Sequence, residues 1–169
     1  MTTKQFQHTI APIKDKLYRF ALRMLDNVPE AQDVVQDVLI KLWQQRDRLA
    51  QITNVEAWTM RMTRNASIDK MRNKHWQSED LSGIVQFATP TSTPDVQAEQ
   101  ADMMQYIQNI IGQLPEKQAS IMHLRDVEGY SYQEIAEALQ IPLNQVKVNL
   151  FRARKSVREQ LVNSGILNS

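Results

Sequence analysis

The chain has 169 residues, of which 42% are hydrophobic and 23% charged, and its formal net charge is +1. This composition is typical of a globular protein, and the length suits one ordinary domain or two small ones. The absence of cysteine excludes disulfides and thiolate metal sites. No apolar run approaches the ~20 residues of a membrane span, and the first residues contain no apolar signal segment. We therefore expect a cytoplasmic protein without membrane insertion.

The near-neutral net charge hides three differently charged blocks. Residues 1–76 carry 13 basic and 8 acidic side chains, residues 77–105 carry five acidic and no basic ones, and residues 106–169 carry 7 basic and 6 acidic ones. The acidic block begins with a stretch rich in Ser, Thr and Pro that has little helical period, which is unusual inside a compact domain. We predict an all-α protein with two small helical domains, residues 1–76 and 100–169, joined by a flexible acidic linker, residues 77–99.

Three or four helices are predicted in the first block. A buried stripe at helical spacing consists of Leu17, Phe20, Ala21, Met24 and Val28. Pro29 suits the first turn of a second helix, and residues 46–54 are expected to form a loop. A third helix, from about residue 55 to 75, is predicted to point Trp58, Met62, Ile68 and Met71 inward.

Two polar stripes in this block have both a structural and a functional interpretation. The second helix carries Asp33, Gln36, Asp37 and Ile40 on one face, which is either favourable placement of acids near the positive helix end or a surface for a partner. The third helix is basic, with Arg61, Arg64, Lys70, Arg72 and Lys74. A basic helix beside aromatic side chains suits single-stranded or melting DNA, although a solvated charged face gives the same pattern.

The second block is expected to contain a helix-turn-helix. Helices are predicted around residues 100–111 and 116–127. Ser131 and Glu134 have the spacing of a capping box, so a short helix should begin there, followed by a turn at residues 140–142. A last helix from residue 143 or 144 to 161 completes the helix-turn-helix.

The last helix is the strongest functional signal. It carries five bases against one acid: Lys147, Arg152, Arg154, Lys155 and Arg158 against Glu159. Phe151 is expected on the outer face, four residues from Lys147. Such a helix suits the major groove of DNA, and the alternative is an amphipathic helix with a solvated charged face. The capped helix, the turn and the basic helix together favour DNA binding.

No constellation in the chain supports catalysis. The three histidines, His8, His75 and His123, lie far apart and form no zinc-binding pair. No nucleophile–base motif is present. We therefore expect no enzyme activity, no cofactor and no metal.

Several motifs resemble the extracytoplasmic-function (ECF) sigma factors of RNA polymerase. Similarity to their region 2 lies at residues 33–43 (DVVQDVLIKLW) and from Trp58 to Arg72. Similarity to their region 4 lies at residues 114–117 (LPEK), 129–136 (GYSYQEIA) and 146–154 (VKVNLFRAR). The resemblance covers nearly the whole chain in order, and it implies that residues 1–76 are region 2 and residues 100–169 are region 4.

The resemblance implies a function in transcription initiation: binding core RNA polymerase, directing it to promoter DNA and helping to open the duplex. It assigns the polymerase contact to Asp33, Gln36 and Asp37, with Trp43 nearby. It assigns capture of a flipped base of the minus-ten element to residues 47–54. The contacts with the neighbouring bases and phosphates are assigned to Trp58, Arg61, Arg64 and Asn65, of which Asn65 has a structural alternative.

In region 4, the resemblance assigns the second helix of the helix-turn-helix to the minus-thirty-five element. Lys147, Val148, Phe151 and Arg152 would face the bases, and Arg154 would reach a phosphate or brace the domain. The resemblance also admits an inhibitory anti-sigma factor as a partner. A free chain is expected to be compact, with its two domains masking part of their DNA surfaces, or to be held by such a partner.

Two alternatives remain open from the residues alone. A stand-alone helix-turn-helix regulator would bind DNA without polymerase, and a helical adaptor would bind proteins only.

Overall fold

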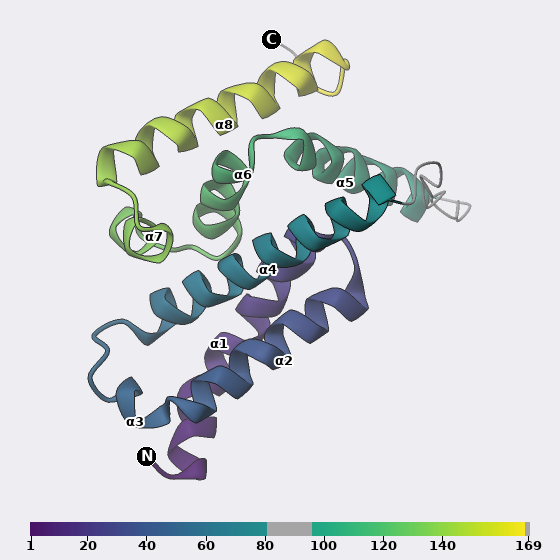
Figure 1. The fold of residues 1–169 in the computed structure, drawn as a ribbon. Coiled ribbons are helices and arrows are strands. Elements are labelled where there is room, and N and C mark those ends of the chain that lie inside the picture. Colours follow the sequence, from purple (N-terminus) through teal and green to yellow (C-terminus); the bar gives the residue numbers. More distant parts are fainter. Residues whose placement is uncertain (81–95, 168–169) are drawn as a thin grey trace.

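The computed structural model describes residues 1–80 and 96–167, and these ranges contain helices and no strand (Figure 1). The predicted all-α fold is confirmed. Side chains are described for residues 1–75 and 102–167. The helices are α1 (Thr3–Leu25), α2 (Val28–Gln44), α3 (Arg46–Leu49), α4 (Val55–Asp80), α5 (Val96–Gln113), α6 (Glu116–Met122), a π-helical segment (His123–Val127), α7 (Tyr132–Leu139) and α8 (Leu143–Asn163).

Short-range capping explains where the helices begin. The Asn27 side chain accepts a hydrogen bond from the backbone N–H of Glu30 at 3.0 Å and starts α2. Ser131 and Glu134 form the predicted capping box of α7, with reciprocal bonds of 3.1 and 3.0 Å. Each bond satisfies a backbone N–H that the first helical turn leaves without a partner. Gln140 ends α7 in the left-handed conformation, with φ of 56°, so the predicted turn is confirmed.

Helix α4 is the central element of the fold. It packs against α1 and α2 on one side and against α7 on the other (Figure 1). The main apolar core therefore contains residues of both blocks, including the fully buried Phe20, Leu42 and Met60 from the first and Leu124 and Ile135 from the second. A smaller cluster joins α5, α6 and α8 through Ile110, Leu114, Ala119, Ala153 and Val157.

Two expected core positions are wrong. Val28 is 48% exposed because the Asn27 cap makes it the first residue of a new helix. Met71 is 41% exposed, and the buried face of α4 includes the small hydroxyl residues Thr59 and Thr63. The Thr63 hydroxyl donates to the carbonyl of Thr59 at 2.9 Å, so its polar atom is satisfied inside the helix and close packing of the helices is allowed.

Four predicted boundaries also differ from the structure. A short helix, α3, lies in the predicted loop 46–54, and the predicted helix 116–127 divides at His123 into α6 and the π-helical segment. Helix α4 continues to Asp80 and α5 begins at Val96, so both ends of the predicted linker are helical. The rest of the predicted linker, residues 81–95, lies outside the described residues.

Candidate nucleic-acid and polymerase interfaces

Helix α8 has one buried and one exposed side. Val146, Leu150, Ala153 and Val157 face the core. The opposite side carries the four residues that the sequence assigns to base contacts: Lys147, Val148, Phe151 and Arg152. Phe151 is 67% exposed and Val148 46% exposed, so this side offers apolar surface as well as charge.

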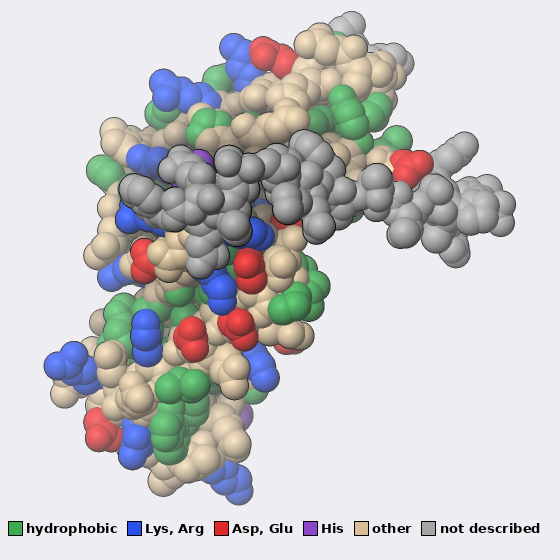
Figure 2. Space-filling model, turned by 45° about the vertical axis from the view of Figure 1, so that its right-hand side comes forward, with side chains coloured by type: hydrophobic (Ala, Val, Ile, Leu, Met, Phe, Trp, Pro, Cys, Tyr) green, Lys and Arg blue, Asp and Glu red, His purple; other side chains and the backbone are tan. Residues whose placement is uncertain are grey.

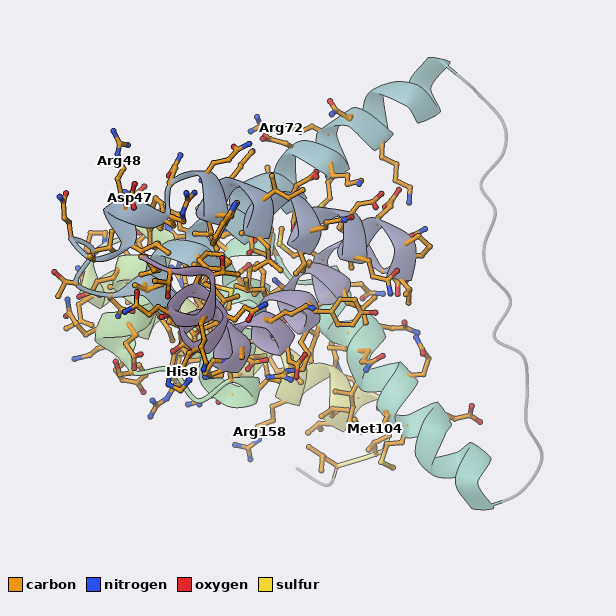
Figure 3. All side chains as sticks on the ribbon, turned by 90° about the horizontal axis from the view of Figure 1, so that it is seen from below. His8, Asp47, Arg48, Arg72, Met104 and Arg158 are labelled. Atoms are coloured by element: carbon orange, nitrogen blue, oxygen red, sulfur yellow. The ribbon has the colours of Figure 1, made fainter. Side chains whose placement is uncertain are left out.

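The exposed side of α8 is strongly basic. Lys147, Arg152, Lys155 and Arg158 form no ion pair with any residue whose side chain is described. Lys and Arg side chains lie along the upper edge of Figure 2, where α8 runs. Figure 3 shows Arg158 projecting away from the body of the protein. Such a surface attracts a polyanion, because releasing counterions from phosphates favours association.

Arg154 does not belong to this free surface. Its guanidinium binds the carboxylate of Asp126 through two nitrogens, and the Nε–Oδ2 distance is 3.2 Å. The hydrogen bond to Asp126 raises the pKa of Arg154. Of the two roles the sequence left open for Arg154, the geometry matches the brace between α8 and the π-helical segment.

The start of α8 is held in place by two contacts. The backbone N–H of Ile141 donates to the carbonyl of Ala136 at 3.1 Å and closes the turn after α7. The Lys117 ammonium donates to the side-chain oxygen of Gln145 at 2.5 Å and ties α6 to the first turn of α8. These two contacts fix the start of α8 relative to α6 and α7.

The residues assigned to the minus-ten element occupy a different setting. Asn65 is exposed and Trp58 is half-buried. Arg64 forms two bonds to Glu116, at 3.2 and 2.6 Å, and Arg61 donates to the backbone carbonyl of Glu137 at 2.7 Å. The structure therefore brings Arg61 and Arg64 against the second block, whereas Lys70 and Lys74 pair with Asp33 and Glu30 of α2.

A second set of polar contacts, which sequence reasoning missed, joins α1 to the second block. Arg19 binds Glu128 through two bonds of 2.7 and 2.8 Å, and the side chain of Glu128 is only 2% exposed. Burial opposes ionisation of Glu128, but its bonds with Arg19 lower its pKa overall. No local pattern marks this pair, because the two residues lie 109 positions apart.

Glu56 links the same two blocks at the start of α4. Its carboxylate accepts from the Lys16 ammonium at 2.7 Å and from the Tyr130 hydroxyl at 2.9 Å. Burial, together with the bond to Glu56, raises the pKa of Tyr130. The Tyr130 hydroxyl is therefore a hydrogen-bond donor at neutral pH.

His123 lies at the same contact between α1 and the second block. Its ring packs edge-on against Phe20 with centroids 5.6 Å apart. Burial and the nearby Arg23 guanidinium lower its pKa to about 4, so the imidazole is neutral at neutral pH. The structure therefore places His123 in the core.

The residues assigned to polymerase contact lie on the outer face of α2. Asp33, Gln36 and Asp37 are exposed, and Asp33 pairs loosely with Lys70 at 3.4 Å. Beside them, a pocket of about 470 Å³ lies between α1 and α2, and Gln36 forms part of its lining. Of these three residues only Gln36 lines the pocket, and Asp33 instead lies beside Lys70 of α4.

Trp43 is not part of that exposed surface. It is half-buried and packs edge-on against Phe6 with ring centroids 5.2 Å apart. The guanidinium of Arg46 lies 4.2 Å from the centre of the indole, as in a cation–π contact. These contacts give Trp43 a packing role at the end of α2.

Among the described side chains, no three His, Asp or Glu residues lie together as a metal site would need. No helix in the described ranges is both long and apolar enough to cross a membrane.

Comparisons with known proteins match both parts of the chain. Residues 10–77 match the family profile of Sigma-70 region 2, and residues 104–157 match that of Sigma-70, region 4. The chain is 30% identical to the ECF RNA polymerase sigma factor SigW of Bacillus subtilis over 157 residues, covering 88% of this chain and 84% of SigW. It is 29% identical to SigL of Mycobacterium tuberculosis, covering 89% and 85% of the two chains.

Two solved structures share the fold. One is the sigma factor RpoE from Bartonella quintana in complex with the anti-sigma factor NepR, with a TM-score of 0.74, 23% identity, and coverage of 94% of this chain and 98% of RpoE. The other is CnrH in complex with the cytosolic domain of CnrY, with a TM-score of 0.68, 19% identity, and coverage of 95% and 89%. The stand-alone regulator is not favoured, because both sigma regions match in order. The chain belongs to the ECF sigma factors, which bind core RNA polymerase and direct it to promoters.

Proposed function

We propose that residues 1–76 form the polymerase-binding and minus-ten module of this sigma factor and that residues 100–169 form its minus-thirty-five module. The observation that carries the second assignment is the exposed side of α8, where Lys147 and Arg152 lie without acidic partners among the described side chains. A helix of this kind fits the major groove, where side chains reach the base edges. Residues 77–99 connect the modules, so each raises the effective concentration of the other at the promoter.

The outer face of α2 supports the polymerase assignment for Asp33, Gln36 and Asp37. These side chains are exposed on neighbouring turns of α2, and Gln36 also lines the pocket between α1 and α2. Trp43 acts behind this face by packing against Phe6, so it shapes the end of α2 without meeting the partner directly.

The minus-ten assignment of Trp58, Arg61, Arg64 and Asn65 requires a change of arrangement. Arg64 is held by Glu116 and Arg61 by the carbonyl of Glu137. A promoter phosphate would compete with these oxygens for the N–H groups of Arg61 and Arg64. Full contact of melted DNA with these two side chains is therefore expected to follow movement of the second block away from α4.

The closed arrangement also fits inhibition by a partner. Both structural neighbours were solved in complexes whose partner is an anti-sigma factor or a cytosolic domain, NepR and CnrY respectively. We infer that an anti-sigma factor can hold this chain with α4 covered. As an initiation factor acting on polymerase, the chain works in the cytoplasm and contributes no catalytic residue of its own.

One experiment tests the function directly. Purified chain and core polymerase would transcribe a library of random promoters, with core polymerase alone as the control. Start sites that depend on the chain and share two elements, one near each expected position, support the proposal. Tight duplex binding by the chain alone, without polymerase-dependent start sites, would instead support a stand-alone regulator.

A further inference from the structure

Two apolar side chains stand in the middle of the basic side of α8. Phe151 is 67% exposed and Val148 46% exposed, and neither belongs to the apolar clusters of the protein. Single exposed apolar side chains are ordinary on a protein surface, but these two are neighbours on one side of a helix and are bordered by Lys147 and Arg152. The role of these two residues is therefore to be sought in what α8 binds.

The surrounding charge identifies the class of partner. Lys147 precedes Val148, Arg152 follows Phe151, and Lys155 lies one turn further along the same helix. None of the three is neutralised by a described side chain. An apolar centre with a cationic border complements the floor and walls of a DNA major groove, where the walls are phosphates.

The one apolar group on the floor of the major groove is the 5-methyl of thymine. Residues three apart on a helix are neighbours on its surface and lie about 4.5 Å apart along its axis. Val148 and Phe151 therefore form one continuous apolar surface, of a size that can contact methyl groups on one or two adjacent base pairs.

We propose that Val148 and Phe151 read the 5-methyl groups of one or two thymines in the upstream promoter element. This inference rests on the proposed assignment of α8 to that element. The Val148 side chain has no hydrogen-bond donor, so it can recognise a base only by apolar contact. Lys147 and Arg152 remain available for guanine edges or phosphates.

The test replaces thymine by deoxyuridine, which lacks only the methyl group. A promoter selected with the holoenzyme would be made with deoxyuridine at each thymine of the upstream element in turn, and holoenzyme affinity would be measured by fluorescence anisotropy. We expect one or two positions at which the loss is about fourfold, the effect of exposing one buried methyl-sized group. Deoxyuridine upstream of the element serves as the control.

Side-chain variants then identify which residue contacts each methyl group. Val148→Ala or Phe151→Ala should weaken binding to the thymine promoter and remove the difference between thymine and deoxyuridine at the matching position. Val127→Ala is the matched control, because Val127 is 60% exposed and lies outside α8. Wild-type holoenzyme that treats thymine and deoxyuridine alike throughout the element would overturn the proposal.

Two further results separate this inference from the function on which it rests. If Lys147→Ala and Arg152→Ala weaken promoter binding while deoxyuridine has no effect, methyl reading fails and the assignment of α8 stands. If neither cationic variant affects promoter binding, both methyl reading and the assignment of α8 to the upstream element are contradicted. If Phe151→Ala weakens binding to core polymerase without DNA and leaves thymine discrimination intact, the apolar pair is a protein contact, and the proposal is overturned.

Discussion

Arg64 of α4 and Glu116 at the start of α6 form a two-point ion pair, with Nε–Oε1 and Nη2–Oε2 distances of 3.2 and 2.6 Å. Two parallel bonds of this kind are the geometry in which arginine binds phosphate as well as carboxylate. If Arg64 contacts a promoter phosphate, as proposed, the carboxylate of Glu116 occupies the position which that phosphate would take. The pair would then connect the conformation of the chain to its access to DNA.

Removing the charge of Glu116 should favour opening. For Glu116→Gln we expect the free chain to bind single-stranded minus-ten DNA a few-fold more tightly, because the pair with Arg64 no longer competes. Both side chains are partly exposed, so solvent screening keeps the effect modest. Fluorescence anisotropy measures the affinity, and energy transfer between labels on α2 and α8 measures the separation of the blocks.

The matched control for that experiment is Glu159→Gln, which removes one charge from the exposed side of α8. Equal gains for the two variants would show that net charge, and not the pair with Arg64, controls access to α4.

Reversing the charges on α2 should weaken polymerase binding. Asp33→Arg combined with Asp37→Arg is expected to lower the affinity for core polymerase at least tenfold, because both exposed side chains would then repel a surface complementary to acids. Surface plasmon resonance measures the affinity and circular dichroism checks folding. The control Glu159→Arg reverses a charge on α8 instead of α2. Unchanged polymerase affinity in the double variant would contradict the assignment of α2 to polymerase contact.

Truncating the cationic side chains of α8 should weaken promoter binding and leave polymerase binding unchanged. Lys147→Ala and Arg152→Ala are each expected to cost ~1–3 kcal/mol of promoter affinity if they contact bases. A change spread evenly over promoter sequences, with a smaller salt dependence, would reassign the residue to a phosphate. Lys4→Ala removes an exposed cation near the start of α1 and should leave promoter affinity unchanged.

Acid should lower the free energy of unfolding through His123. Its pKa in the folded chain is lowered to about 4, from an ordinary value of 6.5. Between these values the unfolded chain takes up a proton that the folded chain does not, so the free energy of unfolding falls as the pH falls from 6.5 towards 4. We expect a loss of roughly 2 kcal/mol between pH 7 and pH 5 from this residue, seen in urea unfolding.

The lowered pKa of Glu128 acts in the same direction at lower pH, because the carboxylate loses its bonds with Arg19 when protonated. His123→Gln separates the two effects, since it removes the imidazole and leaves the Arg19–Glu128 pair. If the pH dependence between 7 and 5 is the same in this variant, His123 is not its source.

Local signals in the sequence were sufficient for most of the fold. The capping box at Ser131 and Glu134 forms as predicted, and Phe151 is exposed on α8 as its spacing indicated. Caps and helical periodicity involve residues three or four positions apart, so one element contains all the information they need. On α4, Trp58, Met62 and Ile68 pack against the core as predicted, and Met71 does not. The buried Thr59 and Thr63 were missed because they carry hydroxyls, which the helix itself satisfies.

The sequence by itself determined the two sigma-type regions, the capped helix-turn-helix, and the residues of α8 that lie opposite its apolar side. Only the tertiary structure decided which of the proposed DNA contacts are free. Arg64 meets Glu116 from 52 positions away, and Arg61 meets the carbonyl of Glu137 from 76 positions away. Pairings over such separations depend on how whole helices dock, and helical periodicity describes only one helix at a time.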